Sequence, residues 1–554
     1  MTQTRKLLDH GLLCNKYERH YLGIFPLVFL TACKGEGITN NFDGLNPSYI
    51  VPDSNFFLPD QPDPYFNSLQ KSENEPYWVD SLLMENGDKI LDQLLQLHNN
   101  VYMYGFPQTV PEYEIPDLKL WDKASVEMQL AARSIFKDLD EILDVKFSET
   151  TELEGFNVIS ISKSFQSNSS GLSYFPNPDY EVGSDLFIAH DYSNPIFVSE
   201  NLTNFDYEVL VHEIGHALGL KHPFAPDRSN LTVLNEYEDN TVLTAMSYSE
   251  VIESFSGSFR AFDHMALTKL YGVNSQFNSG NDIYEFSPNN GIFIVDGSGV
   301  DTISSENSKE NTYVDLRQGS HCHIGEKFDY ISSPFQLTIS HGSDIENVTS
   351  GAGDDIIICN DLSNIIISGH GDDQIYLGAG QDIITSGSGN DIIDCSEIIQ
   401  EKDILVYDTS SVLQGSDTVF GFQQGYLGDL IDLEPLVLNV DSLLPPIIHD
   451  SVPAGFVKNH ILRIVDPDLT SANKVHQAFN SGTKYSEINF LNGASSLLIS
   501  SPSMQTGSKQ YLFKLNKDQI DLDVSHLSTF YGNYLHISNW SSENFLMSSS
   551  DIVS

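Results

Sequence analysis

The sequence predicts a chain that begins with a mixed α/β domain and ends in β structure. Helix-period and strand-period patterns alternate between residues 76 and 272, which indicates an α/β (or α+β) domain. Between residues 273 and 433 the composition shifts to Gly, Asn, Asp and Ile, and a nine-residue repeat over 350–394 predicts a parallel β-roll of short strands. Short apolar runs indicate a further β-rich region over 434–554, and 554 residues are enough for several domains.

The first 75 residues carry the signs of an export signal and a linker. An apolar segment at 21–30 follows basic residues and precedes small ones, so residues 1–33 are predicted to be an export signal. The stretch "LTAC" ending at Cys33 resembles the lipobox of bacterial lipoproteins, which makes Cys33 a candidate for lipid attachment to the outer membrane. An ordinary buried segment is the alternative. Residues 34–75 are rich in Pro, Asn and Asp and predict a linker or a short propeptide.

The charge and cysteine content exclude several classes of partner and site. The chain has 28 basic and 77 acidic residues, a net charge of −49, so it is not expected to bind nucleic acid or an anionic membrane surface. The five cysteines are scattered without a CxxC pair, which argues against a disulfide framework and a thiolate metal site. No apolar run is long enough to span a bilayer as a mature helix.

Three helices and several strands are predicted within the α/β domain. The stretch 121–143 has apolar residues at alternating steps of four and three, which is one face of a helix. Short β-rich runs follow at 156–164 and 185–190. A second helix is expected to begin near Asp206, and a third, "FDHMALTKLYG", to stop at Gly272.

The stretch "HEIGHALGLKH" in the second predicted helix has the spacing of a metal site. His212 and His216 lie one turn apart on the same face, so both imidazoles can bind one metal ion, with Glu213 beside it to take a proton from a bound water. Gly219 allows the chain to turn so that His222 returns as a third ligand. Three nitrogen ligands leave a fourth position open, as in a catalytic zinc site. An accidental spacing in a buried helix is the alternative.

This pattern, HExxHxxGxxH, resembles the signature of the metzincin zinc proteases. That family has a methionine turn beneath the metal, and "TAMSYS" matches it with Met246. Tyr248 matches the tyrosine that, in the serralysin branch, reaches the zinc and assists in the transition state. The similarity extends through "VDSLL", "YMYGFP", "GLSYFPNP" and "FDHMALTKLYG", over about 78–272, and continues into the repeats. The resemblance implies a zinc endopeptidase that cleaves proteins or peptides through a metal-activated water, with Glu213 as the general base.

The nine-residue units approximate G-G-x-G-x-D-x-U-x, a calcium-binding repeat in which U is a large apolar residue. The sixth-position aspartates offer hard oxygen ligands suited to Ca²⁺: Asp355, Asp373, Asp382 and Asp391. The eighth-position isoleucines are expected to fill a thin core. One unit, "CNDLSNIII", has Asn364 in place of the aspartate, and a further unit at 296–304 stands alone. An acidic β-solenoid without metal is the alternative.

Together these features predict an exported bacterial endopeptidase with one catalytic zinc ion and several structural calcium ions. We expect a monomer that is secreted or held at the cell surface by a lipid on Cys33. Two alternatives stay open: a calcium-stabilised surface or adhesion protein with weak catalysis, and a lipid-anchored processing protease. The end of the chain, "ENFLMSSSDIVS", resembles the terminus of proteins exported by a C-terminal signal, so both export routes stay open.

Overall fold

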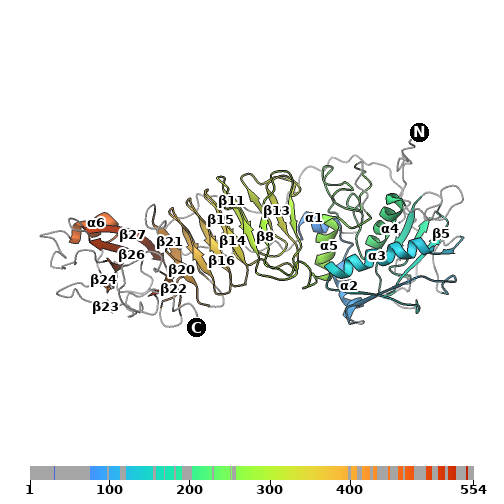
Figure 1. The fold of residues 1–554 in the computed structure, drawn as a ribbon, viewed down its shortest axis with the longest axis horizontal. Helices are drawn as coiled ribbons and strands as arrows, with labels where there is room; N and C mark the ends of the chain where they lie inside the picture. Colours follow the sequence, from blue (N-terminus) through green and yellow to red (C-terminus); the bar gives the residue numbers. More distant parts are fainter. Residues whose placement is uncertain are drawn as a thin grey trace, which may run out of the picture.

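The computed structural model shows an elongated molecule, with an α/β domain at one end and a long stack of short strands running from it (Figure 1). The residues it describes are 30–31, 75–96, 99–112, 120–153, 158–166, 169–179, 182–189, 203–227, 230–249, 251, 257–396, 401–407, 415–424, 428–432, 447–449, 460–465, 468–479, 495–501, 509–517, 522–531 and 545–546. Of the predicted export signal, only Leu30 and Thr31 are among them. Cys33 and the linker up to residue 74 lie outside the described residues.

The α/β domain contains one mixed sheet. Its strands are β1 (Leu30–Thr31), β2 (Val101–Gly105), β3 (Asp122–Lys123), β4 (Lys146–Glu149), β5 (Val158–Ser164), β6 (Gly171–Tyr174) and β7 (Leu186–Ala189). The order along the sheet is β1-β6-β7-β5-β2-β4, with β3 paired to β5. Strands β4, β2, β5 and β7 run parallel, whereas β6 is antiparallel to β7 and β1 to β6.

The described residues of this domain form five helices: α1 (Tyr77–Asp80), α2 (Gly87–Gln96), α3 (Val126–Ile142), α4 (Asn204–Ala217) and α5 (Ala261–Tyr271). The three helices predicted from sequence are α3, α4 and α5. Ser125 caps α3, because its side chain accepts a hydrogen bond from the Met128 amide. The predicted apolar face of α3 is buried except near its end, where Ile142 is partly exposed. Helix α5 stops before Gly272, as predicted, with Gly272 at φ +73°.

The strands after Gly272 form two long sheets that face each other across a thin apolar core. One sheet is ordered β8 (Ile283–Glu285), β10 (Thr302–Ser304), β14 (Asn347–Thr349), β16 (Ile365–Ile367), β18 (Ile383–Thr385), β20 (Ile404–Val406), β22 (Leu430–Asp432) and β28 (Phe545–Leu546). The other is ordered β9 (Ile292–Ile294), β13 (Gln336–Ile339), β12 (His321–Ile324), β11 (Thr312–Asp315), β15 (Ile356–Ile358), β17 (Gln374–Tyr376), β19 (Ile392–Asp394), β21 (Asp417–Phe420), β27 (Leu522–Tyr531), β26 (Gln510–Lys517), β25 (Ser495–Ser501), β24 (His460–Val465) and β23 (Ile447–His449). We call the part from β8 to β22 the parallel stack, because its strands pair in parallel except for β12, which is antiparallel to β11 and β13.

The nine-residue repeat corresponds to half a turn of the parallel stack. Ile356 pairs with Gln374 in one sheet, and Ile365 pairs with Ile383 in the other, each an offset of 18 residues. Two consecutive units therefore make one turn, one unit in each sheet. The unit "CNDLSNIII" supplies β16, and the unit at 296–304 supplies β10, so both belong to the same stack. The eighth-position isoleucines are buried in the core between the sheets.

The described strands beyond residue 433 extend the same two sheets. Strand β27 pairs in parallel with β21, and β28 pairs in parallel with β22. Helix α6 (Ala472–Phe479) lies against β27. Strand pairing therefore crosses the predicted boundary between 433 and 434 on both sheets. Among the described residues, no helix is both long enough and apolar enough to cross a membrane.

Candidate metal centre

Helix α4 carries the first part of the predicted metal site, and its start is fixed by a capping box. Thr203 accepts a hydrogen bond from the Asp206 amide at 3.3 Å, and the Asp206 carboxylate accepts one from the Thr203 amide at 2.7 Å. The helix then runs through the motif without interruption, which places His212 and His216 one turn apart. All residues from 208 to 217 are buried.

The end of α4 returns the chain toward these two histidines. Gly219 has φ +100°, a conformation that costs little only for glycine, and the Leu220 amide donates to the Gly215 carbonyl at 2.9 Å. The chain then follows residues 82–84, since the Lys221 amide donates to the Leu82 carbonyl at 2.7 Å. This path brings His222 back over α4.

The three histidines converge on one point. Nε2 of His222 lies 3.2 Å from Nε2 of His212 and 3.1 Å from Nε2 of His216. A tetrahedral zinc ion with bonds of about 2.0–2.1 Å separates its ligand atoms by about 3.3 Å, so this spacing fits zinc. The Nδ1 atoms of His212 and His216 donate to the carbonyls of Ala245 at 2.8 Å and Leu220 at 2.7 Å, which leaves each Nε2 as the free ligand atom.

The electrostatics of the site also favour a cation. Burial lowers the pKa of His212 to about 4, and burial together with the neighbouring histidines lowers the pKa of His216 and His222 well below the usual value, so all three stay neutral as ligands must be. Glu213 is 5% exposed, and burial raises its pKa to about 8. Its Oε2 accepts no hydrogen bond from the described residues. A buried carboxyl oxygen without a partner, on the residue that follows His212 in α4, fits a water molecule bound to the metal.

The structure also brings Met246 and Tyr248 to the three histidines. Met246 is completely buried beneath α4, where a Cβ atom at Gly215 would lie 2.5 Å from its sulfur. The Tyr248 hydroxyl lies 3.1 Å from Nε2 of His222. The residues predicted for zinc binding and for catalysis, together with the methionine turn, therefore lie within one site.

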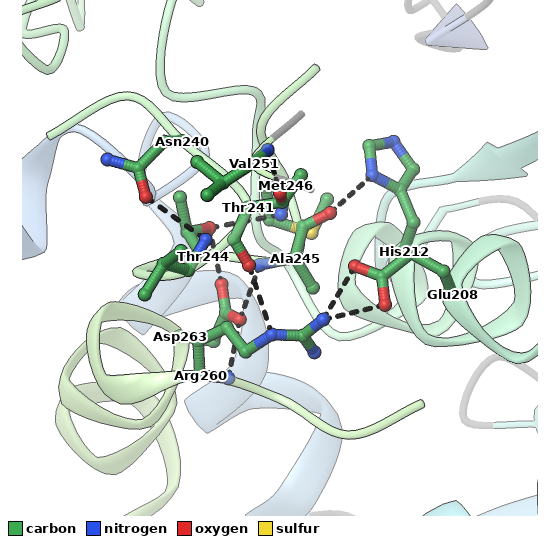
Figure 2. A network of polar contacts seen from close by, with 11 residues as sticks. Glu208, His212, Asn240, Thr241, Thr244, Ala245, Met246, Val251, Arg260 and Asp263 are labelled. Atoms are coloured by element: carbon green, nitrogen blue, oxygen red, sulfur yellow. Dashed lines mark hydrogen bonds and ion pairs between the residues drawn. The ribbon is translucent and has the colours of Figure 1, made fainter. Parts of the chain in front are cut away.

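A network of polar contacts behind this site was not predicted from the sequence. Figure 2 shows His212 linked through Ala245 to Asp263 on α5. Asp263 accepts hydrogen bonds from the Ala245 amide at 2.8 Å and the Thr244 hydroxyl at 2.6 Å, so it positions the carbonyl that orients His212. Arg260 beside it pairs with Glu208 of α4 at 2.7 and 2.9 Å. In the sequence, the one feature that could have indicated this role of Asp263 is its position as an acidic residue in the first turn of the predicted third helix.

The predicted calcium ligands lie along the parallel stack in two ladders and do not meet at one point. In one ladder the Asp355 amide donates to Asp373 at 2.8 Å, and the Asp373 amide to Asp391 at 3.0 Å. The second carboxylate oxygen of each of these three accepts no hydrogen bond from the described residues, and burial raises their pKa values to about 6, 9 and 6 in that order. Asp382 belongs to the ladder of the other sheet, where its amide donates to Asp403 at 3.0 Å. Buried carboxylates of this kind fit a hard cation.

A further cluster of carboxylates lies where the parallel stack begins. Ligand atoms of Asp282, Asp296 and Asp301 lie within 4.8 Å of one another, and Asp296 and Asp301 are completely buried. None of these three aspartates was predicted from the sequence as a metal ligand. The isolated unit at 296–304 could have indicated Asp301, which occupies its sixth position.

Known proteins that are similar to this chain test the resemblance to the serralysin branch that its motifs suggest. No protein-family model matches the chain. Metallopeptidase AprA of Pseudomonas marginalis is 27% identical over 274 residues, which is 44% of this chain and 56% of that protein. Serralysin G of Dickeya chrysanthemi is 27% identical over 422 residues, 70% of this chain and 79% of its own length. Serralysin of Proteus mirabilis is 27% identical over 315 residues, 48% of this chain and 62% of its own.

The chain is related to the serralysin-type metalloproteases. The resemblance predicted from the motifs is thereby confirmed. The chain spans a little over half the length of AprA and a larger part of Serralysin G.

Proposed function

We propose that this protein is a zinc-dependent endopeptidase of the metzincin type that cleaves peptide bonds in proteins. One zinc ion would be held by His212, His216 and His222, within a catalytic domain over residues 76–272. The observation that carries the proposal is the convergence of the three histidines, with Nε2 of His222 at 3.2 Å from Nε2 of His212 and at 3.1 Å from Nε2 of His216. The buried, unpartnered oxygen of Glu213 on the same helix adds to it. Among the described residues, no further His, Cys, Asp or Glu joins these three, so a coordination position is left for water, as in a catalytic zinc site.

When bound, zinc supplies a Lewis acid that polarises the scissile carbonyl and makes a water molecule acidic. Glu213 then takes the proton of the attacking water and passes it to the leaving amine. The Tyr248 hydroxyl donates a hydrogen bond to the oxyanion that develops on the carbonyl. Met246 packs under α4 and, with Asp263 behind Ala245, keeps His212 in one orientation.

Calcium is proposed to stabilise the parallel stack as a β-roll over residues 273–433. Support comes from the buried, unpartnered oxygens of Asp355, Asp373 and Asp391 and from the place of Asp382 in the second ladder. The cluster at the start of the stack is of the same kind. The proposed place of action is outside the cell, on the basis of the export signal predicted over 1–33. Lipid attachment at Cys33 rests on the lipobox-like stretch alone.

The test is casein hydrolysis by purified protein in millimolar calcium, with Glu213→Gln as the variant. Removing the base keeps all three ligands, so bound zinc should persist while the rate falls by about 10²–10⁴-fold. Glu236→Gln is the matched control, because Glu236 is an exposed carboxylate in the same region. If the wild-type protein binds zinc and cuts no protein substrate, the proposal is wrong and the surface-protein alternative replaces it.

A further inference from the structure

Tyr248 lies between two serines whose backbone is joined by one hydroxyl group. The Ser247 hydroxyl donates to Oδ1 of Asp239 at 2.5 Å and accepts the Ser249 amide at 3.0 Å. Ser247 is buried, so this hydroxyl is shielded from water. The residues on both sides of Tyr248 are therefore linked through a single side chain, and that side chain is held by Asp239.

The chain that leaves Tyr248 is held by Thr241. The Thr241 amide donates to the Ser249 carbonyl at 3.1 Å, and the Thr241 hydroxyl accepts the Val251 amide at 3.1 Å. The Thr241 carbonyl accepts a hydrogen bond from the guanidinium of Arg260 at 3.2 Å, directly before α5 (Figure 2). Because Thr241 and Arg260 are both buried, the backbone after Tyr248 is anchored to the interior of the α/β domain.

Asp239 is itself held in place by the turn in which it lies. The Asn235 carbonyl accepts the Asp239 amide at 2.9 Å, and the Asn235 side chain accepts the Glu238 amide at 3.0 Å. The Glu238 carboxylate accepts the hydroxyl of Tyr77 at 2.6 Å, which connects this turn to α1. Because its own backbone and its neighbour are both bonded, the Asp239 carboxylate presents a fixed acceptor to Ser247.

The side chain of Tyr248 reaches from this anchored backbone to the proposed metal centre. Its hydroxyl lies 3.1 Å from Nε2 of His222, and its ring stacks against that of His212, with centroids 5.4 Å apart and planes 26° apart. A donor that stabilises an oxyanion acts best when it is already in place where the charge develops, because no free energy is then spent on reorganisation. A shift of the Tyr248 backbone would move the hydroxyl away from that place. A displacement of about 1 Å is enough to lower a rate by about 100-fold.

We propose that Asp239 and Ser247 are positioning residues for Tyr248. The hydrogen bond between them fixes the backbone around Tyr248, so that its hydroxyl lies where the oxyanion of the transition state forms. This inference rests on the proposed endopeptidase function, in which Tyr248 is the donor to the oxyanion. Asp239 is not among the side chains that converge with the three histidines, so its effect is expected to pass through Tyr248 and not through the bound metal.

The first test compares Asp239→Ala with Asp239→Asn in the zinc-loaded full chain. Alanine removes the acceptor for the Ser247 hydroxyl, whereas asparagine keeps a side-chain oxygen that can accept the same bond. On a quenched fluorescent peptide that the wild type cleaves, Asp239→Ala should lower kcat about 10–100-fold and change KM less than about twofold. Asp239→Asn should restore most of the lost rate. Ser247→Ala removes both bonds of the hydroxyl and should show the same loss, so it replaces Asp239→Ala if that variant does not fold.

A double-mutant cycle with Tyr248→Phe shows whether the effect passes through the Tyr248 hydroxyl. Tyr248→Phe should itself lower kcat. In that background Asp239→Ala should lower kcat less than about twofold further, because the group that it positions is already gone. A readout without catalysis is the affinity for a peptide phosphinate, whose tetrahedral oxygens mimic the oxyanion. For Asp239→Ala, the Kd of the phosphinate should rise by the same factor as kcat/KM falls, while the Kd of the product peptide stays unchanged.

Controls separate this inference from a general loss of structure and from the proposed function. Glu236→Ala removes an exposed carboxylate from the same turn and should leave kcat unchanged. Every variant should hold as much zinc as the wild type. Additive losses in the cycle, loss of zinc from Asp239→Ala, or an Asp239→Asn variant as slow as Asp239→Ala would overturn the inference while leaving the endopeptidase intact. An unchanged kcat for Tyr248→Phe would overturn it as well. Absence of any cleavage by zinc-loaded wild type would instead refute the proposed function on which the inference rests.

Discussion

Replacing Lys221 by methionine should remove the hydrogen bonds that link Ala225 and Thr232 to Ser81 at the end of α1, and it should lower the stability of the α/β domain. The residue is 2% exposed, and its ammonium donates to three backbone carbonyls at 2.6, 2.8 and 3.2 Å. Methionine keeps a similar unbranched side chain but has no donor, so the buried Ser81 carbonyl and the partly exposed carbonyls of Ala225 and Thr232 lose their partner. At about 2 kcal/mol for the buried acceptor and about 1 kcal/mol for each partly exposed one, the loss is about 4 kcal/mol.

Part of this loss in stability is offset, because burying the charged ammonium of Lys221 is itself unfavourable in free energy. Burial lowers the pKa of Lys221 from 10.5 to about 8, which corresponds to about 3 kcal/mol. The net cost of Lys221→Met is therefore about 1 kcal/mol. For a domain of this size, that lowers the melting temperature by about 2–4 °C.

Thermal unfolding followed by near-ultraviolet circular dichroism, in excess calcium and zinc, measures this change. Lys137→Met is the matched control, since Lys137 lies on α3 with its side chain 74% exposed and pairs only with the exposed Glu141 in the next turn. Surface pairs of this kind contribute little, so the control should melt with the wild type. A melting temperature for Lys221→Met that also equals the wild type would show that its three carbonyl contacts do not stabilise the α/β domain.

Three further predictions concern the metal centre, the junction between the α/β domain and the parallel stack, and the buried carboxylates of the stack. Asp263→Asn should weaken zinc binding by about 10–100-fold, measured by competition with a chelator, because it disturbs the Ala245 carbonyl that orients the first ligand; unchanged affinity would contradict this role. Glu238→Gln should lower the melting temperature by several degrees. Glu238 is completely buried and accepts hydrogen bonds from Tyr77 at 2.6 Å and from Ser332 at 2.8 and 3.1 Å. The two bonds from Ser332 join the α/β domain to the parallel stack. Calcium-free protein should be more stable at pH 5 than at pH 8, because burial raises the pKa of Asp373 to about 9, so the folded state binds the proton that the unfolded state releases above about pH 4. Its stability then falls as the pH rises through this window, and saturating calcium should remove the trend; greater stability at pH 8 without calcium would show that these carboxylates are not strained by burial.

Local patterns in the sequence were sufficient for much of the site and of the stack. The four-residue spacing of His212 and His216 is a property of any uninterrupted helix, and the turn at Gly219 depends on a conformation that only glycine adopts at low cost. The repeat of nine residues similarly encodes one short strand and one turn per unit. Because these features depend on residues close in the chain, their spacing alone predicts helix α4, the return of the third ligand, and a series of parallel strands.

Other features depend on contacts between distant parts of the chain, and these are seen only in the folded structure. The donors and acceptors that orient the site come from far away: Ala245 lies 33 residues beyond His212, and Ser81 lies 140 residues before Lys221. The nine-residue units alternate between two sheets. At the end of the stack, β27 pairs with β21 and β28 pairs with β22, so strands from distant parts of the chain extend the same two sheets. The local sequence pattern does not predict these long-range pairings. The free energy that favours them comes from burying surfaces that meet only in the folded chain.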